Sequence, residues 1–512
     1  MKEKNIVIFT GQSGIKVKEC IKRLIGKNNY ISVDDKIAEI SENGFICVLE
    51  KTYKELRELW SKAFEDIHNN IINEKTDELV PLTFHAVYYH QRKIDFFSPV
   101  DLNKIIQLKG RVKLVINFID DIYDVYRRLM MPGEMYQLVK QNAGLVKQNA
   151  ETPLTIISES IIYLMRLLDW RAFELSFSQK VAEIVEAPIY VIPAKYPRYM
   201  VQKLLEEEEG KLKMLYLSHP IRGKREDRQF QLEVNDFVKS AIKEYNIILF
   251  YPTGIDELRI KKNNGGYEPR LNERWKVLDE NERISPPLGE FANINPFFPA
   301  LKENEIPEIS DGEKVVSSKL KILERLIKQQ VTSRDYTLIE QAKNGTIVYR
   351  SFGSSDIESE VKYTDDLERK IILYAPEEDF GEWRTKVLLE ELSKSTTIGD
   401  RIKEINTEKI KGELSKEKIQ KDDVKNNTRN TIEKYVGNNY DFPDLRINRS
   451  ERVLESELEL ERKKRVDDGW KGIYEKIKTP PILKKYENIK LTKDKMKPED
   501  LVSEILKILS DQ

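Results

Sequence analysis

An apolar run leads directly into a turn that carries three arginines and a glycine. The segment reads YLSHPIRGKREDR and contains Arg222, Gly223, Arg225 and Arg228. Guanidinium groups offer paired donors that match the oxygens of a phosphate, and glycine lets the backbone approach an anion closely. The pattern predicts a phosphate-binding turn. A simpler alternative is a solvated turn in which Glu226 and Asp227 begin a helix and pair with the arginines.

Two carboxylates farther along the chain could cleave a glycosidic bond. Asp335 lies in a helical pattern, and Glu360 follows the strand-like run TIVYRS and a turn that contains Ser354 and Ser355. In cleavage of an N-glycosidic bond, one carboxylate attacks or stabilises the anomeric carbon while an acid assists departure of the base. We therefore expect both carboxylates to converge at one sheet edge. For each of them alone, a helix cap or an exposed charge is the alternative.

The N-terminal run IVIFTGQSGIKVKECIKRLI predicts a strand, a glycine-containing turn and a helix. Backbone N–H groups in such a turn face an anion, so the candidate nucleotide-binding residues are Gly11, Ser13, Gly14 and Lys16. A complete P-loop also needs a second glycine and a Lys-Ser/Thr pair. Counted from Gly11 without a gap, those positions hold Lys16, Val17 and Lys18. The phosphate-binding lysine and the magnesium-binding hydroxyl are missing.

The elements that position these residues alternate between apolar runs and amphipathic stretches. This alternation predicts an α/β protein with two parallel-sheet, three-layer domains, followed by a charged, mainly helical C-terminal region. We expect domain boundaries at 1–205, 212–380 and 381–512. A segment at about 260–315, rich in Asn, Pro and Gly, is too long for an ordinary connection and predicts a lid or an ordered excursion.

Composition excludes several classes of protein. In 512 residues, 86 Lys and Arg nearly balance 87 Asp and Glu, so no overall field attracts nucleic acid or an anionic membrane. The apolar runs are too short to span a bilayer, and the N-terminus reads as a strand rather than a signal peptide. Two cysteines and four histidines do not suggest a disulfide framework or a metal centre. We expect a cytoplasmic homo-oligomer that binds no metal, no membrane and no nucleic acid.

The central region resembles the 2′-deoxynucleoside 5′-phosphate N-hydrolases of the nucleoside 2-deoxyribosyltransferase family. Their first strand and turn read Tyr-Phe-x-Gly-Ser-Ile-Arg-Gly-Gly-Arg-Glu-Asp-Arg, and the chain matches at Tyr216, Ile221, Arg222, Gly223 and residues 225–228. The resemblance implies that Glu360 is the nucleophile, that Asp335 orients or protonates, and that Tyr216 approaches the sugar or the nucleophile. It further implies a phosphate site formed by Arg222, Gly223, Arg225, Ser354 and Ser355.

The chain departs from this family at several positions. His219 and Pro220 replace Gly-Ser, and Asp356 stands where the family has a glycine, so that its charge would repel a phosphate. A shifted register would assign the phosphate cradle to Ser351 and Gly353. The nucleophile would then be Glu360 or, less well, Glu358.

The N-terminal region resembles the adenylate-kinase-like nucleotide kinases through GQSG, LTFHA and VINFIDDIYDVYRRL. Thr83 stands where these kinases carry an acidic metal-binding residue. Asp120 and Asp121 could bind magnesium, although solvated or capping carboxylates are the alternative. We expect a degenerate kinase domain retained for binding or structure, and Mg and ATP would be needed only if it were an active kinase.

The expected activity is hydrolysis of the N-glycosidic bond of a (deoxy)nucleoside 5′-monophosphate or related nucleotide, without a cofactor. The alternatives are a nucleoside deoxyribosyltransferase, a non-catalytic nucleotide sensor or scaffold, and an active nucleotide kinase. Glycosidase and transferase share their residues, so only their products separate them.

Overall fold

A computed structural model gives the structure of the chain. It describes residues 5–26, 30–41, 51–69, 78–90, 95–129, 153–206, 212–221, 227–245, 247–255, 259–263, 266–270, 283–286, 314–352, 355–376, 379, 383, 387, 489–492 and 496–510. The predicted α/β class is confirmed, because parallel sheets flanked by helices form the described parts of the chain.

The first sheet has five strands in the order β2-β3-β1-β6-β7, all parallel. The strands are β1 (Ile6–Gly11), β2 (Ile31–Ser32), β3 (Val80–Thr83), β6 (Val112–Ile119) and β7 (Ile189–Pro193). All of β1 is buried, as expected for a parallel strand with both faces covered. The carboxyl ends of these strands lie at one edge, where ligands of open α/β sheets bind.

Helices cover this sheet on both faces. Ile6 and Ile8 of β1 join a core that includes Val181 and Val185 of α8. Side chains alternate along a strand, so Val7 and Phe9 point to the other face. The helices that follow the strands of this sheet are α1 (Val17–Ile25), α2 (Val33–Ile40), α4 (Tyr53–Ile67), α5 (Leu102–Ile105), η3 (Ile106–Leu108), α6 (Ile122–Leu129), α8 (Pro153–Val185) and α9 (Arg198–Glu206).

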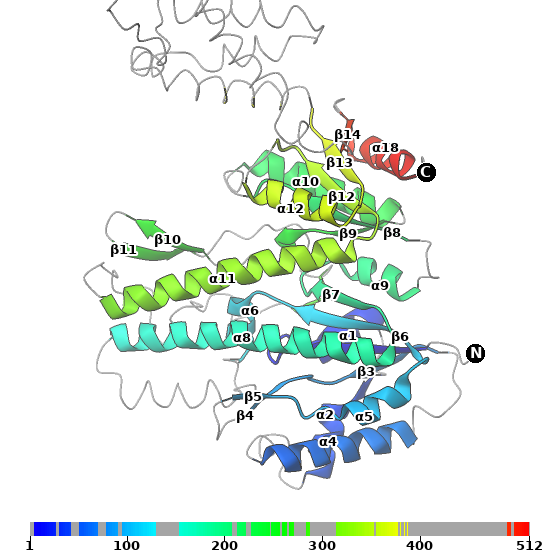
Figure 1. Cartoon of the computed structure of the whole chain (residues 1–512), viewed down its shortest axis with the longest axis vertical. Helices are drawn as coiled ribbons and strands as arrows, with labels where there is room; N and C mark the ends of the chain where they lie inside the picture. The colour runs from blue at the N-terminus through cyan, green and yellow to red at the C-terminus, as the bar shows by residue number, and fades with distance from the viewer. Residues whose placement is uncertain are drawn as a thin grey trace, which may run out of the picture. The chain divides into compact units, whose positions relative to one another are not determined.

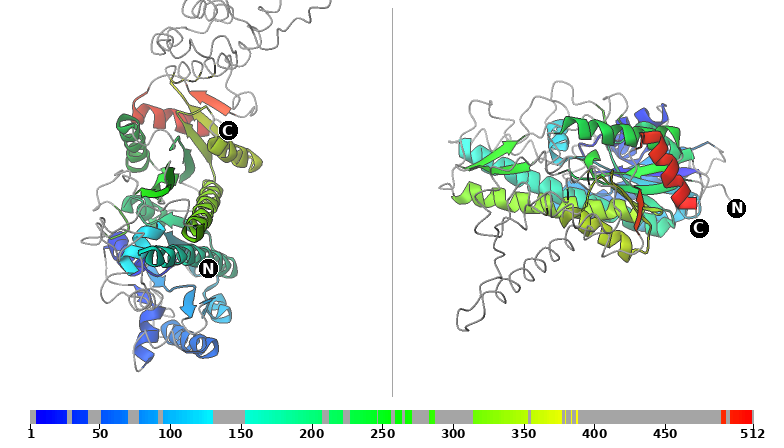
Figure 2. Two further views of the ribbon diagram at one scale, coloured as in Figure 1. Left: turned by 90° about the vertical axis from the view of Figure 1, so that its left-hand side faces the viewer. Right: turned by 90° about the horizontal axis from the view of Figure 1, so that it is seen from above.

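Helix α11 (Lys314–Gln341) lies beside α8 (Figures 1 and 2). Arg171 of α8 donates to Gln330 of α11 at 3.0 Å, and the Gln341 side chain pairs with the backbone of Val191. Within the long segment between β9 and α11, residues 284 and 285 hydrogen-bond to Tyr196 and Ala194. Within the predicted insertion, residues 284 and 285 thus lie beside the end of β7.

Two short antiparallel hairpins complete this region. The first joins β4 (Tyr88–His90) to β5 (Asp95–Phe97), and the second joins β10 (Arg259–Asn263) to β11 (Gly266–Arg270). A single turn of 3-10 helix, η4 (Pro252–Gly254), follows β9.

The second sheet has the strand order β14-β13-β12-β8-β9. The strands are β8 (Lys213–Ser218), β9 (Ile247–Phe250), β12 (Gly345–Tyr349), β13 (Ile371–Tyr374) and β14 (Ile489–Thr492), and the helices that accompany them are α10 (Arg228–Glu244), α12 (Ser355–Asp366) and α18 (Pro498–Ser510). The pairings from β8 through β14 are parallel. The C-terminal region, predicted as mainly helical, thus also supplies a strand.

Two compact units result from this arrangement, one of Met1–Lys213 with Ile242–Gln341 and one of Met214–Ala241 with Ala342–Gln512. The first unit extends beyond the predicted boundary at residue 205 because α11 packs along α8. The second includes C-terminal residues because β14 pairs with β13. Among the described residues, no helix is both long enough and apolar enough to cross a membrane.

Candidate functional site

Glu360 of α12 is held by two hydroxyl groups from β8. Tyr216 Oη donates to Oε1 at 3.2 Å, and Ser218 Oγ donates to Oε2 at 2.5 Å. Both donors are fully buried, whereas Glu360 is partly exposed. The structure thus brings together the predicted nucleophile and Tyr216, and it adds Ser218. Hydrogen bonds to both oxygens stabilise the ionised carboxylate that a nucleophilic role requires.

The position of Glu360 follows from how α12 is fixed to the sheet. Ile357 and Val361, four residues apart, are buried on one face of the helix. Thr364 Oγ1 lies 2.7 Å from Thr346 Oγ1 of β12 and also donates to the Glu360 carbonyl at 2.9 Å. Thr346 is itself the register partner of Tyr216. This buried connection places the Glu360 side chain at the end of β8.

Two residues at which the chain departs from the quoted motifs, His219 and Asp356, lie near Ser218 and Glu360 in the sequence. His219 is buried, and burial lowers its pKa to about 4, so the imidazole is neutral at pH 7. Asp356 is exposed in the first turn of α12. A neutral imidazole supplies no positive charge for a phosphate, and Asp356 contributes a negative one.

A third charged group near the strand ends, Arg350, is already paired. Its Nε and Nη2 atoms donate to Asp379 at 2.8 Å each, and Nη1 contacts Glu233. The backbone of Arg350 has φ 52°, the left-handed region that a non-glycine residue seldom adopts. Two carboxylates neutralise this guanidinium, so it is not a spare cation for a substrate.

The predicted phosphate residues fall mainly outside the described part of the chain. Arg222, Gly223, Arg225 and Ser354 lie outside the described residues, as does Gly353 of the alternative register. Ser355 is the first residue of α12, and its side chain is not described. Asp227, from the same arginine-rich turn, accepts from the Phe230 amide at 3.1 Å and caps α10. For Asp227, the helix-start alternative therefore holds.

Asp335, the second predicted carboxylate, lies on α11 in the other compact unit. Arg334 donates to Asp335 Oδ1 through Nε at 2.9 Å and through Nη2 at 2.7 Å. The Nη1 atom of Arg334 donates to the Ile255 carbonyl at 3.0 Å. The Oδ1 atom of Asp335 is thus engaged by the guanidinium of its neighbour in the chain.

Comparison with known proteins adds no family. No protein-family model and no curated protein matches the chain. The resemblances therefore remain those carried by the quoted motifs, and the geometry must support any function.

The second candidate region is the carboxyl edge of the first sheet. Gly11 ends β1, and the turn from Gln12 to Lys16 leads into α1, as predicted. Gly14 has φ 88°, and a Cβ built there would lie 2.9 Å from Leu129 Cγ and 3.0 Å from Val125 Cγ1. Ser13 is buried, and Lys16 caps α1 with φ 62°. Helix α6 therefore packs directly on the turn that could have cradled a phosphate.

The side chain of Glu174 of α8 lies at the same edge of the sheet and accepts hydrogen bonds from backbone amides. Its Oε1 atom accepts from Gly11 N at 3.2 Å and from Ala86 N at 2.8 Å, and Oε2 accepts from Val87 N at 2.7 Å. Burial raises the pKa of Glu174 to about 7, although these hydrogen bonds and His85 oppose that shift. A carboxylate of the chain itself thus bonds the amide groups at this edge.

Next to Glu174 lies a pair formed by the buried Asp34 and the partly exposed His85. Asp34 Oδ2 lies 2.8 Å from His85 Nδ1 and accepts from the His85 amide at 3.1 Å, and Tyr88 donates to Oδ1. Burial alone would lower the pKa of His85, but the Asp34 carboxylate raises it above its usual value. Positive charge is therefore favoured on His85, between two carboxylates.

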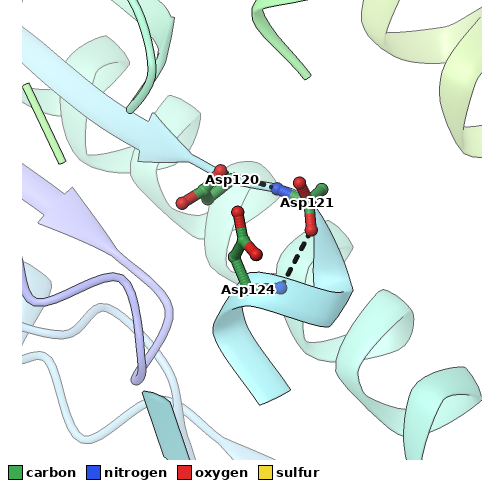
Figure 3. Close-up of side chains that lie close together, drawn as sticks. All are labelled: Asp120, Asp121 and Asp124. Carbon is green, nitrogen blue, oxygen red and sulfur yellow. Dashed lines mark hydrogen bonds between the residues drawn. The ribbon is translucent and has the colours of Figure 1, made fainter. Parts of the chain in front are cut away.

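Three aspartates gather where β6 ends and α6 begins, as Figure 3 shows. Asp120, Asp121 and Asp124 are at most 1 % exposed. The ammonium group of Lys195 lies among them, 2.7 Å from Asp124 Oδ2, 3.4 Å from Asp120 Oδ1 and in contact with Asp121. Asp121 also accepts from the Asp124 amide at 2.9 Å and so caps α6. In this arrangement the three carboxylates are paired with a lysine of the same unit.

Two arginines of α6 complete the charge balance. Arg128 donates to Asp120 at 2.8 Å and to the Gly14 carbonyl at 3.3 Å, and Arg127 donates to Asp124 at 3.2 Å. Both arginines are thus engaged with carboxylates, and Arg128 also with the turn, of their own unit.

Sequence reasoning missed Ser218, Glu174 and Lys195. Ser218 could have been found, because it lies two residues after Tyr216 on a strand and therefore faces the same side. Glu174 and Lys195 carry no such signal, since their partners lie 163 residues (Gly11 to Glu174) and 74 residues (Asp121 to Lys195) away.

Proposed function

We propose that the chain is an N-glycosidase of nucleotide-like substrates, with Glu360 as the carboxylate nucleophile. The observation that carries this proposal is the pair of hydrogen bonds from Tyr216 and Ser218 to the two oxygens of Glu360. A partly exposed carboxylate with both oxygens oriented, at the carboxyl edge of a parallel sheet, suits attack on a sugar carbon.

The reaction would proceed in two steps. A Glu360 oxygen attacks C1′ of the sugar, and the C1′–N bond breaks with its electron pair moving onto the base, which takes up a proton. Water then attacks C1′, releases the Glu360 carboxylate and gives up a proton. Tyr216 and Ser218 hold the carboxylate oxygens throughout. A role for Asp335 stays a prediction from the resemblance.

The nature of the substrate follows from the same residues. The resemblance implies a 5′-monophosphate bound by Arg222 and Gly223, while neutral His219 and exposed Asp356 weaken the attraction for a phosphate. We therefore include nucleosides and dinucleotides beside monophosphates. Transfer of the sugar to a second base uses the same intermediate and remains the closest alternative.

A second candidate, a non-catalytic sensor or scaffold, is favoured by one observation about the first unit. The charged groups at its sheet edge bond one another, with Glu174 on backbone amides and Lys195 among three aspartates. Such an edge suits a structural or recognition role better than phosphoryl transfer. The first unit would then support the glycosidase unit without reacting itself.

The experiment measures release of free base. Purified full-length protein is incubated with a panel of nucleoside 5′-monophosphates, the matching nucleosides and NAD, and the products are separated by chromatography. We expect release from at least one substrate, and a loss of about 10³-fold or more in Glu360→Gln. Folding of each variant is checked by circular dichroism and thermal unfolding.

Glu358→Gln is the matched control, since Glu358 lies on the same helix two residues earlier. It should retain most activity. Loss in Glu358→Gln with retention in Glu360→Gln would assign the nucleophile to Glu358 and overturn the proposed geometry. Tight nucleotide binding without any release would favour the sensor.

Two additions separate the remaining alternatives. Sugar transfer to an added acceptor base, in place of release, would identify a transferase. Phosphoryl transfer from ATP to a monophosphate would identify an active kinase.

A further inference from the structure

Glu174 stands out among the buried carboxylates because its partners are main-chain donors. It is 1 % exposed, and its two oxygens accept from the amides of Gly11, Ala86 and Val87. A buried N–H group left without an acceptor destabilises the folded state. Three such groups at one point therefore require an anion or another strong acceptor.

The donors come from two neighbouring strands and point to one place. Gly11 ends β1, and Ala86 and Val87 follow β3, the strand that pairs with β1 in parallel. Clustered amides at the carboxyl edge of an α/β sheet form an anion-binding site. His85, next to Ala86 in the chain, adds a positive charge that Asp34 favours.

The Glu174 backbone is fixed to the same edge by a second set of bonds. Ser178 donates to the Glu174 carbonyl at 2.7 Å and lies 2.8 Å from Thr10 Oγ1. Asn117 of β6 donates to Thr10 Oγ1 at 3.0 Å and to Ser178 Oγ at 3.1 Å. This buried network holds α8 so that the carboxylate reaches the amides.

We propose that the amides of Gly11, Ala86 and Val87 form an anion site for a monocarboxylate, and that its occupant is Glu174 of the chain itself. An external anion reaches these amides only by displacing Glu174. The inference concerns the first unit and does not depend on the proposed glycosidase function of the second.

Chemical rescue tests this inference. Glu174→Ala removes the side-chain atoms beyond Cβ, which correspond to one acetate ion. We expect the variant to unfold roughly 5–10 °C below the wild type in chloride buffer. Added acetate at constant ionic strength should restore much of that loss saturably, because it binds only the folded state. Formate should restore less, and tetrahedral phosphate should restore little.

Two further variants make the result specific. The first is Glu183→Ala, at a residue of the same helix whose side chain is 64 % exposed. This variant should neither lose stability nor respond to acetate. Glu174→Gln keeps the space filled and should show no acetate response. Equal responses of Glu174→Ala and Glu174→Gln would place the acetate elsewhere and overturn the inference.

Failure of Glu174→Ala to fold is also decisive. Recovery of folded protein when the variant is refolded with acetate, but not with chloride, supports the site. Absence of recovery with either salt contradicts it, because acetate should then occupy the vacated position.

Discussion

Ser218 Oγ lies 2.5 Å from Oε2 of Glu360, closer than Tyr216 Oη is to Oε1 at 3.2 Å. Each hydroxyl group thus holds a different oxygen of the proposed nucleophile. Ser218 thereby acts as a positioning residue for the proposed nucleophile.

Ser218→Ala is expected to lower kcat for base release by roughly 10–100-fold, because a hydrogen bond to a charged group contributes about 1.5–3 kcal/mol. KM should change little, since Ser218 is fully buried behind Glu360. Steady-state kinetics on the best substrate of the panel measure both constants. Ser240→Ala, at another buried serine of the same unit, serves as the control. A Ser218→Ala variant with unchanged kcat would remove Ser218 from the site.

Tyr216→Phe should have a smaller effect, roughly 3–10-fold on kcat, since the bond to Oε1 is longer and weaker. The change keeps the buried ring and removes only the hydroxyl group. Tyr349→Phe, on the neighbouring strand β12, is the matched control and should retain full activity. If Tyr216→Phe proved far more damaging than Ser218→Ala, the hydrogen bond from Ser218 would not be the stronger of the two.

Much of the fold could be predicted from local patterns. The runs NIVIFT and KMLYLS are continuous and apolar, as buried parallel strands are, and both form strands. The contact of Tyr216 with Glu360 was expected from the resemblance alone, which implied that Tyr216 approaches the sugar or the nucleophile. Strand β14 was not expected, because IKLT is short and lies in a lysine-rich stretch that gives almost no strand signal.

The buried charged groups of the first unit could not be predicted from such local patterns. Glu174 sits in the middle of a 33-residue helix, where a glutamate ordinarily faces solvent. Lys195 follows β7, and nothing near it in the sequence indicates that Asp120, Asp121 and Asp124 surround its ammonium group. Only the packing of α6 and α8 on the sheet reveals these partners.

Lys195→Met should destabilise the first unit by about 3–5 kcal/mol, because it leaves buried carboxylates without their cation. Denaturant unfolding followed by circular dichroism measures the loss. Lys180→Met is the control. The side chain of Lys180 is 57 % exposed and forms an ion pair with Glu183, which is also exposed. Mg²⁺, which prefers carboxylate ligands, should partly restore Lys195→Met and leave the wild type unchanged. A loss below about 0.5 kcal/mol would mean that the lysine is not a structural cation.

Glu174→Gln should change how stability depends on pH. Burial raises the pKa of Glu174 to about 7 in the folded chain, from 4.5 for an unperturbed glutamate. The folded state therefore binds more protons than the unfolded state between these values, so the stabilising contribution is complete below pH 4.5 and is lost as the pH rises through 7. Glu174→Gln cannot titrate there. His85 faces Glu174, and the Glu174 carboxylate contributes to the raised pKa of His85. This contribution changes the stability difference between wild type and Glu174→Gln in the same direction.

We expect the wild type to be more stable relative to Glu174→Gln at pH 5 than at pH 8, as measured by denaturant unfolding at both values. Glu183→Gln, on the exposed face of α8, should show the same pH profile as the wild type. A difference between wild type and Glu174→Gln that stays constant from pH 5 to pH 8, or grows in the opposite sense, would contradict a raised pKa of Glu174.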